Sequence, residues 1–276
     1  MPCPGIALPL LYFLCVISGN RFQLQLFVGC SGWNYDAWLG HFYPKRVESG
    51  RWLEYYSKVF DYVEIDSTFY RTPNFKMVMR WASTTPPNFR FSAKFPQVVT
   101  HDTRLGGGLD GLLHFFEAMK PLQNRILCLL MQLPPSLKKE EGLPKLERLI
   151  PLLWQKYRYA IEVRHESWFT NEVYDLLKKH KICLAWSQQD AIQTPPELTT
   201  DFFYLRFIGD EKDSGKIQKD RQKEMDKWAK AVNRVKDRLS FGIVAANNSY
   251  AGFGPATANE FRKLLGLPAG IWEQMK

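Results

Sequence analysis

Eight short apolar runs recur along the chain and predict eight β-strands. They cover residues 26–30, 62–66, 90–94, 125–132, 158–164, 182–187, 202–207 and 240–247. Most are nearly continuous in apolar residues, which is typical of strands covered on both faces by helices. Helical patterns occur at 51–59, 109–120, 171–180, 217–237 and 256–265. The stretch 188–201 is rich in Pro and Thr and predicts a loop, so the sixth helix is short or absent.

Strands that alternate with helices predict a parallel sheet. Eight such units close into a TIM-type (β/α)8 parallel barrel, and 276 residues suit one barrel. The sequence contains no linker, internal repeat or low-complexity tract. We therefore expect a single α/β domain over residues 25–276.

Polar or charged residues end nearly every strand, on the parity of its inward face. They are Ser31, Glu64 with Asp66, Lys94, Gln132, Glu162 with Arg164, Ser187, Arg206 and Asn247. Every second side chain of a strand lies on one face of the sheet. These residues should therefore meet at the C-terminal end of the barrel, hereafter the mouth, where such barrels place their chemistry.

The residue types at the mouth favour acid–base chemistry on a small ligand. Glu64 and Glu162 are the candidate catalytic groups, because a positioned carboxyl group can donate or accept a proton. Lys94, Arg164 and Arg206 offer anion binding. The remaining candidate ligand-binding residues are Asp66, Gln132, His165, Asn247 and Asn248. In the competing interpretation, Glu162 and Arg164 pair with Arg206 or Glu64 and merely fill the end of the barrel.

Aromatic residues make up 14% of the chain, and many of them lie next to the strand ends. Trp33, Tyr70 and Trp168 are the candidates for stacking against a sugar ring or a base. The alternative is that these rings pack loops onto the barrel.

Metal, disulfide and cofactor sites are not predicted. A divalent metal could be bound by Glu64, Asp66, Glu162 and His165. However, His165 has the opposite parity to Glu162, and no closely spaced acidic triplet occurs. Five cysteines without a Cys-x-x-Cys pair argue against a disulfide framework or a thiolate metal site. No Gly-x-Gly-x-x-Gly directly follows a predicted strand and no Gly-x-Ser-x-Gly occurs, so a dinucleotide cofactor and a nucleophilic-serine hydrolase are disfavoured.

The net charge is +9, and much of the excess lies in residues 216–238. A solvated helix face explains such a run, whereas a nucleic-acid surface is the rival explanation. No nucleic-acid-reading motif accompanies the charge, so nucleic acid is an unfavoured partner.

The N-terminus carries an apolar stretch at 6–17, followed by Ser18, Gly19 and Asn20. It resembles the apolar region of a signal peptide but lacks leading Lys or Arg, and it is too short to span a bilayer. Three interpretations of residues 1–24 stay open. They are an export-like signal, another kind of extension, or residues that precede the true start of the protein because the start codon is assigned too far upstream. Internal thiols favour a cytoplasmic location.

Several blocks occur together in one order and resemble the YecE-like family, the domain of unknown function 72. They are Ser31–Trp38 with Phe42–Pro44, Glu64–Tyr70 with Pro73, Phe91–Lys94, Gln132–Pro135, Glu162–Trp168, Tyr204–Arg206 and Asn247–Asn248. The resemblance runs from about Phe27 to Leu265 and implies a TIM barrel similar to sugar isomerases. This chain departs from the family pattern at Ile208, where many members carry His, and at Asp66, where Asn is common.

Three functions are compatible with these patterns. The first is an enzyme, isomerase-like or lyase- or hydrolase-like, that acts by acid–base chemistry on a sugar-like or sugar-phosphate ligand at the mouth. The second is a protein that binds a small polar or anionic ligand without turnover. The third is a nucleic-acid-processing barrel. The oligomeric state is not predicted.

Overall fold

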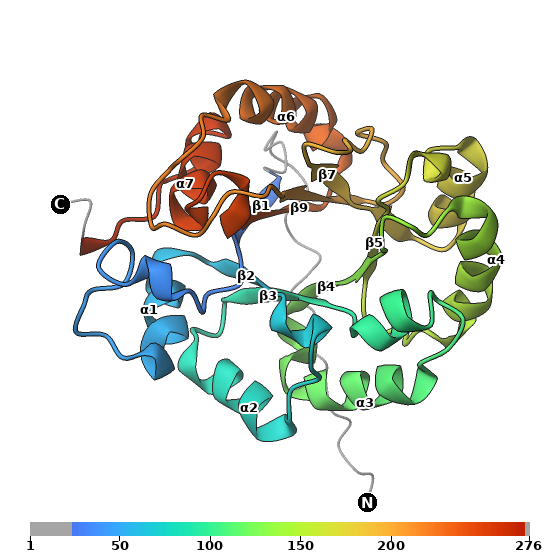
Figure 1. Cartoon of the computed structure of the whole chain (residues 1–276), viewed down its shortest axis with the longest axis horizontal. Helices are drawn as coiled ribbons and strands as arrows, with labels where there is room; N and C mark the ends of the chain where they lie inside the picture. The colour runs from blue at the N-terminus through green and yellow to red at the C-terminus, as the bar shows by residue number, and fades with distance from the viewer. Residues whose placement is uncertain (1–23, 274–276) are drawn as a thin grey trace, which may run out of the picture.

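A computed structural model describes residues 24–273 and has a ring of helices around a central parallel sheet (Figure 1). Residues 1–23 of the predicted N-terminal extension, which include Cys3 and Cys15, lie outside the described residues. The strands are β1 (Gln25–Ser31), β2 (Tyr62–Ile65), β3 (Arg90–Lys94), β4 (Ile126–Gln132), β5 (Tyr159–Glu162), β6 (Ile182–Leu184), β7 (Trp186–Gln188), β8 (Phe202–Phe207) and β9 (Phe241–Asn247).

The sheet is a TIM-like barrel, as the alternation of strands and helices predicted. Its order is β6-β5-β4-β3-β2-β1-β9-β8-β7, and neighbouring strands pair in parallel. The predicted sixth strand is divided at Ala185, so that β6 pairs with β5 whereas β7 pairs with β8. The barrel is therefore closed by one strand segment that changes partner half-way along.

The helices are α1 (Trp52–Val59), α2 (Phe75–Thr84), α3 (Leu109–Met119), α4 (Lys139–Leu149), α5 (Asn171–Lys179), α6 (Gln222–Val235) and α7 (Gly254–Leu264). Short helical turns are η1 (Asp36–Trp38), η2 (Ser49–Arg51), η3 (Ser67–Phe69), η4 (Val98–Asp102), η5 (Lys120–Arg125), η6 (Ile150–Leu152), η7 (Glu166–Trp168), η8 (Lys236–Arg238) and η9 (Asn248–Tyr250). Each of the five predicted helices is present. The helix predicted over 217–237 begins at Gln222, where the Asp220 side chain accepts a hydrogen bond from the Gln222 amide at 2.9 Å.

The sequence pattern missed α2 and α4. In α2, Phe75, Met77 and Met79 are exposed, so its apolar residues do not form one buried stripe. Helix α4 contains Gly142 and Pro144, both of which weaken a helical pattern. In contrast, the predicted loop at 188–201 is confirmed, and residues 189–201 form no helix in the outer ring between α5 and α6 (Figure 1).

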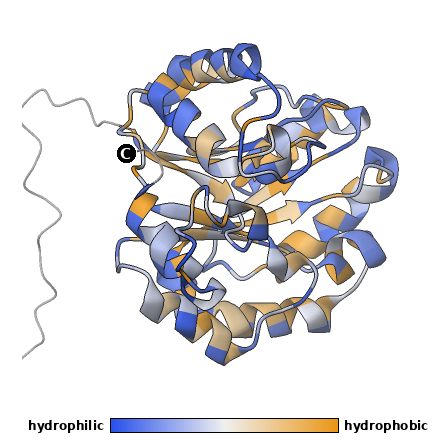
Figure 2. Cartoon of the chain, turned by 60° about the vertical axis from the view of Figure 1, so that its left-hand side comes forward, coloured by the Kyte–Doolittle hydropathy of each residue, from blue (hydrophilic) through white to orange (hydrophobic). Residues whose placement is uncertain are grey.

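Two apolar cores surround the strands, one on each face of the sheet. Inside the barrel lie small and aromatic side chains of the inward parity, among them Phe27, Cys128, Ala160, Cys183 and Ile243. The larger core fills the space between the strands and the helices. Accordingly, the strands in the centre are largely apolar, whereas the helices mix apolar and polar residues (Figure 2). Cys30, Cys128 and Cys183 are buried free thiols, in agreement with their predicted core positions.

Candidate functional site

The barrel interior changes from apolar to polar toward the mouth. Each position around the barrel contributes one strand-end side chain of the inward parity. These side chains are Ser31, Glu64, Lys94, Gln132, Glu162, Ser187, Arg206 and Asn247. The register aligns them in adjacent strands, since Ser31 lies opposite both Glu64 and Asn247. Gln132 likewise lies opposite Glu162, and Ser187 opposite Arg206. The structure thus brings together the strand ends that parity selected.

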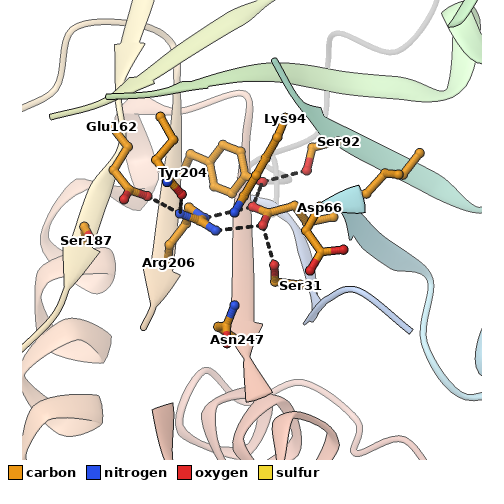
Figure 3. A network of polar contacts seen from close by, with 12 residues as sticks. Ser31, Asp66, Ser92, Lys94, Glu162, Ser187, Tyr204, Arg206 and Asn247 are labelled. Carbon is orange, nitrogen blue, oxygen red and sulfur yellow. Dashed lines mark hydrogen bonds and ion pairs between the residues drawn. The ribbon is translucent and has the colours of Figure 1, made fainter. Parts of the chain in front are cut away.

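Arg206 is the centre of this cluster and is only 1% exposed (Figure 3). Its Nε and Nη2 donate to the Oε2 and Oε1 atoms of Glu64, each at 2.8 Å. Its Nη1 donates to Oε2 of Glu162 and, at 3.2 Å, to Oε1 of Gln132. One buried guanidinium therefore joins two carboxylates from opposite sides of the barrel in a bidentate and a single contact.

A layer of hydroxyl groups lies against the Glu64 carboxylate. Tyr204 donates to Oε2 of Glu64 at 2.5 Å, and Ser31 donates to Oε1 at 2.5 Å. The hydroxyls of Tyr62, Ser92 and Tyr204 also contact one another, at 2.6 to 3.0 Å. Burial raises the pKa values of both tyrosines well above their usual value, so that they remain hydrogen-bond donors.

Both glutamates are held ionised. Burial alone would raise their pKa values, but the charge of Arg206 together with further charges and hydrogen bonds outweighs it. With help from Lys94 and the hydrogen bonds from Arg206 and Ser31, the pKa of Glu64 falls to about 2. The pKa of Glu162 is lowered by Arg206 and Arg164 together.

Arg164 reaches Glu162 from the open side of the cluster. The strand predicted over 158–164 ends at Glu162, so Arg164 lies just beyond β5. Its Nε donates to Oε1 of Glu162 at 2.7 Å, and its side chain is 20% exposed. Gln189 donates to the Ser187 hydroxyl at 2.6 Å and to Oε1 of Glu162 at 3.5 Å. Glu162 thus has one oxygen on the buried Arg206 and one on partners that solvent can reach.

Lys94 and Asp66 form the least paired part of the cluster. Asp66 accepts one long hydrogen bond, 3.4 Å from the Tyr35 hydroxyl. Within residues 24–273, the amine of Lys94 has no hydrogen bond or ion pair, and it lies 6.0 Å from the centre of the Phe69 ring. Burial raises the pKa of Asp66 and lowers that of Lys94 to about 8, in the latter case with help from the Arg206 charge. Both groups are thereby moved toward their neutral forms.

Comparison with known proteins shows which family this chain belongs to. The family described as "Protein of unknown function DUF72" matches residues 27–275. The chain belongs to the DUF72 family. It is 32% identical over 145 residues to the UPF0759 protein YecE of Escherichia coli strain K12, a match that covers 52% of this chain and 50% of that protein. The chain thus spans about half the length of YecE in this match.

Two further relatives span most of the chain. The UPF0759 protein YunF of Bacillus subtilis is 24% identical over 278 residues, which cover 88% of this chain and 95% of that protein. The crystal structure of a DUF72 family protein from Thermotoga maritima is 27% identical, with a TM-score of 0.75. That similarity covers 88% of this chain and 99% of the other. The barrel and its family, both expected from the sequence, are confirmed.

Five other predicted ligand-binding residues of this DUF72 chain lie outside the polar cluster. Trp168 is buried and donates to the Leu137 carbonyl at 2.8 Å, whereas Asn248 accepts from the Trp38 indole at 2.7 Å. His165 accepts from the Ser167 amide and caps η7. Trp33 packs edge-on against Trp81, and Tyr70 is 76% exposed. In the described part of the chain, none of the five contacts a strand-end side chain through a hydrogen bond or ring.

His101 is a neighbour of the cluster that the sequence analysis did not select. It lies in η4, a π-helical turn, and its ring packs edge-on against Phe69 at 4.7 Å. Partial burial and the charges of Arg164 and Lys94 lower its pKa. Turns of this kind occur often at functional sites. No periodicity fixes the direction of a loop residue, so the sequence held no signal for His101 or for Gln189.

A surface hollow of about 640 Å³ begins at Ser67 of η3. It is lined by the segment after η3, by α2 and by His114 of α3, and no strand-end side chain lines it. Among residues 24–273, no three His, Cys, Asp or Glu side chains form a group that could hold a metal ion. No helix in the same range is long and apolar enough to cross a membrane.

Proposed function

We propose that this DUF72 protein is an enzyme that acts by acid–base chemistry on a small sugar-like or sugar-phosphate ligand at the mouth. The observation that carries the proposal is the ring of polar strand ends, with one inward side chain from each position of the barrel. Carboxylates, guanidinium groups, an amine and amides in one place match the hydroxyls and anionic groups of such a ligand.

Glu64 and Glu162 support this function in different ways. Each oxygen of Glu64 accepts hydrogen bonds from both Arg206 and a hydroxyl group, which favours a positioning role. Glu162 shares one oxygen with Arg164, whose side chain is partly exposed. A ligand anion that draws Arg164 away would free this oxygen to accept a proton. We therefore assign proton transfer to Glu162 and ligand binding to Arg164.

Asn247 supplies a hydrogen-bond donor that faces the cluster. Its Oδ1 accepts from the amide and hydroxyl of Ser249, at 2.9 and 2.8 Å. Its amide nitrogen is directed toward Arg206 and the carboxylates (Figure 3). Replacement by Ala would remove both the donor and this cap, at a cost of about 1 kcal/mol. Asn247→Asp keeps an oxygen for the cap and removes only the donor.

The test is a thermal-shift screen of sugars and sugar phosphates, followed by affinity and turnover measurements on the hits. We expect Asn247→Asp to weaken binding about tenfold, because one hydrogen bond is lost and a negative charge is added. Asn124→Asp, the same change on an exposed residue of η5 before β4, should bind as the wild type does. Equal affinities in both variants would contradict a ligand site at the mouth.

Glu162→Gln then separates catalysis from binding. This variant keeps the shape of the side chain but cannot take up a proton, so turnover should fall by about 10² to 10⁴ while the ligand still binds. Full turnover would remove Glu162 from the mechanism. Binding without turnover in the wild type would leave a ligand-binding protein as the better assignment.

A further inference from the structure

Lys94 differs from the other two cations of the polar cluster in having no partner to neutralise it. Arg206 contacts Glu64 and Glu162, and Arg164 contacts Glu162. Two carboxylates therefore already balance two guanidinium groups. Within the described residues, the Lys94 amine makes neither a hydrogen bond nor an ion pair.

The position of Lys94 places its amine among the strand-end side chains of the mouth. It is the last residue of β3 and is partly buried, and it has the same inward parity as Glu64 and Glu162. Its side chain reaches into the cluster next to Arg206 (Figure 3). A ligand held by Arg164 and Asn247 would therefore lie close to an amine that is not engaged by the protein.

We propose that Lys94 is a nucleophile that forms an imine with the carbonyl group of an aldose or ketose, so that the substrate class is a carbonyl-bearing sugar or sugar phosphate. This inference rests on the proposed function and adds a covalent step to it. A lysine removed from water is a recurrent way to obtain a neutral, reactive amine in proteins.

The step balances without an outside reactant. The protonated amine first gives a proton to a neighbouring carboxylate, for which Asp66 is suited because burial favours its neutral form. The amine nitrogen then attacks the carbonyl carbon, and the electrons of the carbonyl π bond move to the oxygen, which takes up the proton. The nitrogen of this carbinolamine then releases one proton to solvent. Its hydroxyl group takes up one proton from solvent and leaves as water. The net change is ammonium plus carbonyl to iminium plus water.

The iminium group explains why a weak base is sufficient in this site. It withdraws electrons from the adjacent carbon and acidifies its proton. Glu162 has a lowered pKa and is therefore a weak base, which suits removal of an acidified proton. The positive charge of the iminium would also be stabilised by the carboxylates that face Lys94, namely Glu64, Asp66 and Glu162.

Chemical trapping tests the imine directly. The whole protein is incubated with glycolaldehyde or dihydroxyacetone and sodium cyanoborohydride, which adds hydride to the iminium carbon and leaves a stable secondary amine. Peptide mass spectrometry then compares every lysine. At pH 7, a pKa near 8 leaves about 300 times more neutral amine than the usual 10.5. We expect Lys94 to be labelled at least about tenfold faster than the surface lysines.

The pH profile and a matched variant complete the test. The labelling rate of Lys94 should level off above about pH 8, whereas surface lysines continue to gain up to higher pH. The groups that face Lys94 and set this midpoint are Arg206, Glu64, Asp66 and Glu162. Lys94→Arg keeps a cation and should lose the label. Labelling of Lys94 that is no faster than that of surface lysines between pH 6 and 9 would overturn the proposal.

A ligand without a carbonyl group distinguishes this proposal from the proposed function. Ribitol 5-phosphate cannot form an imine, but it carries the hydroxyls and the phosphate. Its binding to the wild type without trapping at Lys94 would overturn the imine and leave the proposed function in place. Trapping without binding of ribitol 5-phosphate would support the imine and count against a sugar phosphate as the substrate. Failure of both would overturn both.

Discussion

Arg206 and its two carboxylates are buried charges whose stability depends on one another. Breaking such a pair by removing one partner costs about 3–5 kcal/mol, because the other charge is left unpaired. Glu64 accepts four hydrogen bonds, from Ser31, Tyr204 and twice from Arg206. The carboxylate of Glu64 is thus part of the folded core at neutral pH, and its protonation should destabilise the protein.

The pH dependence of stability should report on Glu64. Its pKa is about 2 in the folded protein and near 4.5 when unfolded, so its contribution is present above pH 4.5 and is lost as the pH falls toward 2. A shift of this size corresponds to about 3 kcal/mol. We expect Glu64→Gln to be less stable than the wild type at pH 7 and to lose less further stability on acidification, as measured by urea unfolding at pH 7 and pH 3. Glu140→Gln, at an exposed position of α4, should follow the wild type; parallel curves for Glu64→Gln and the wild type would exclude the predicted pKa.

Parity along strands predicted which strand-end residues meet, because a strand fixes the direction of every second side chain. It allowed a pairing of Glu162 with Arg206, but it could not predict that Arg206 would contact both glutamates, since pairing depends on distances across the barrel. Nor could it reject Trp168 or Asn248, which follow strands β5 and β9 but turn into the outer core. Residues beyond a strand end lose the period that makes their direction predictable.

At the scale of elements, the strands were easier to predict than the helices. Strands covered on both faces are apolar throughout, whereas a short outer helix shows only a weak stripe. Helix α4 illustrates this, because its interior Gly142 appears unfavourable from sequence alone. In the structure, a Cβ atom at position 142 would lie 2.4 Å from a ring carbon of Trp168. The glycine is therefore required by packing against η7.

Gly142→Ala should consequently destabilise the protein by about 1–3 kcal/mol, although alanine is the better helix former. The matched control is Gly111→Ala in α3, where the new Cβ would meet only the end of the Val98 side chain, at 2.9 Å. One methyl group must shift there instead of a buried indole ring, so the control should be destabilised less than Gly142→Ala. The two variants are compared by chemical denaturation; a neutral Gly142→Ala would show that α4 can shift away from Trp168.

At the scale of the whole molecule, length, strand count and loop signals sufficed to predict a single barrel. The excess positive charge agrees with a solvated helix face, because α6 buries Met225, Trp228, Ala229 and Val232 and leaves Lys223, Lys227 and Lys230 exposed. The division of the sixth strand at Ala185 was not predictable, since it depends on how two edges of a closing sheet meet. The loop that replaces the sixth helix contacts β6 next to this division through the Thr199 side chain.

The closing segment, residues 182–188, should be the first part of the sheet to open. β1 and β9 pair at seven consecutive positions, whereas β6 and β7 pair at three each, with different neighbours. Thr199, in the loop before β8, binds the edge of β6, since its hydroxyl accepts from the Leu184 amide and donates to the Ile182 carbonyl, both at 2.7 Å. We expect amide hydrogen exchange at 182–188 to be faster than in β1, and Thr199→Val to accelerate it further without affecting β1. Uniform exchange around the barrel would contradict this order.

The divided strand also connects the candidate site to the closure of the barrel. Ser187 lies in β7 and Gln189 directly after it, and Gln189 connects this segment to Glu162 in β5. A molecule bound against Glu162 and this segment would therefore hold β7, at one edge of the sheet, close to β5, which is next to the other edge. In thermodynamic terms, binding and closure are linked, so that each makes the other more favourable. Ligand binding would then have its largest effect on the stability of the closing segment, which is the part of the sheet expected to open first.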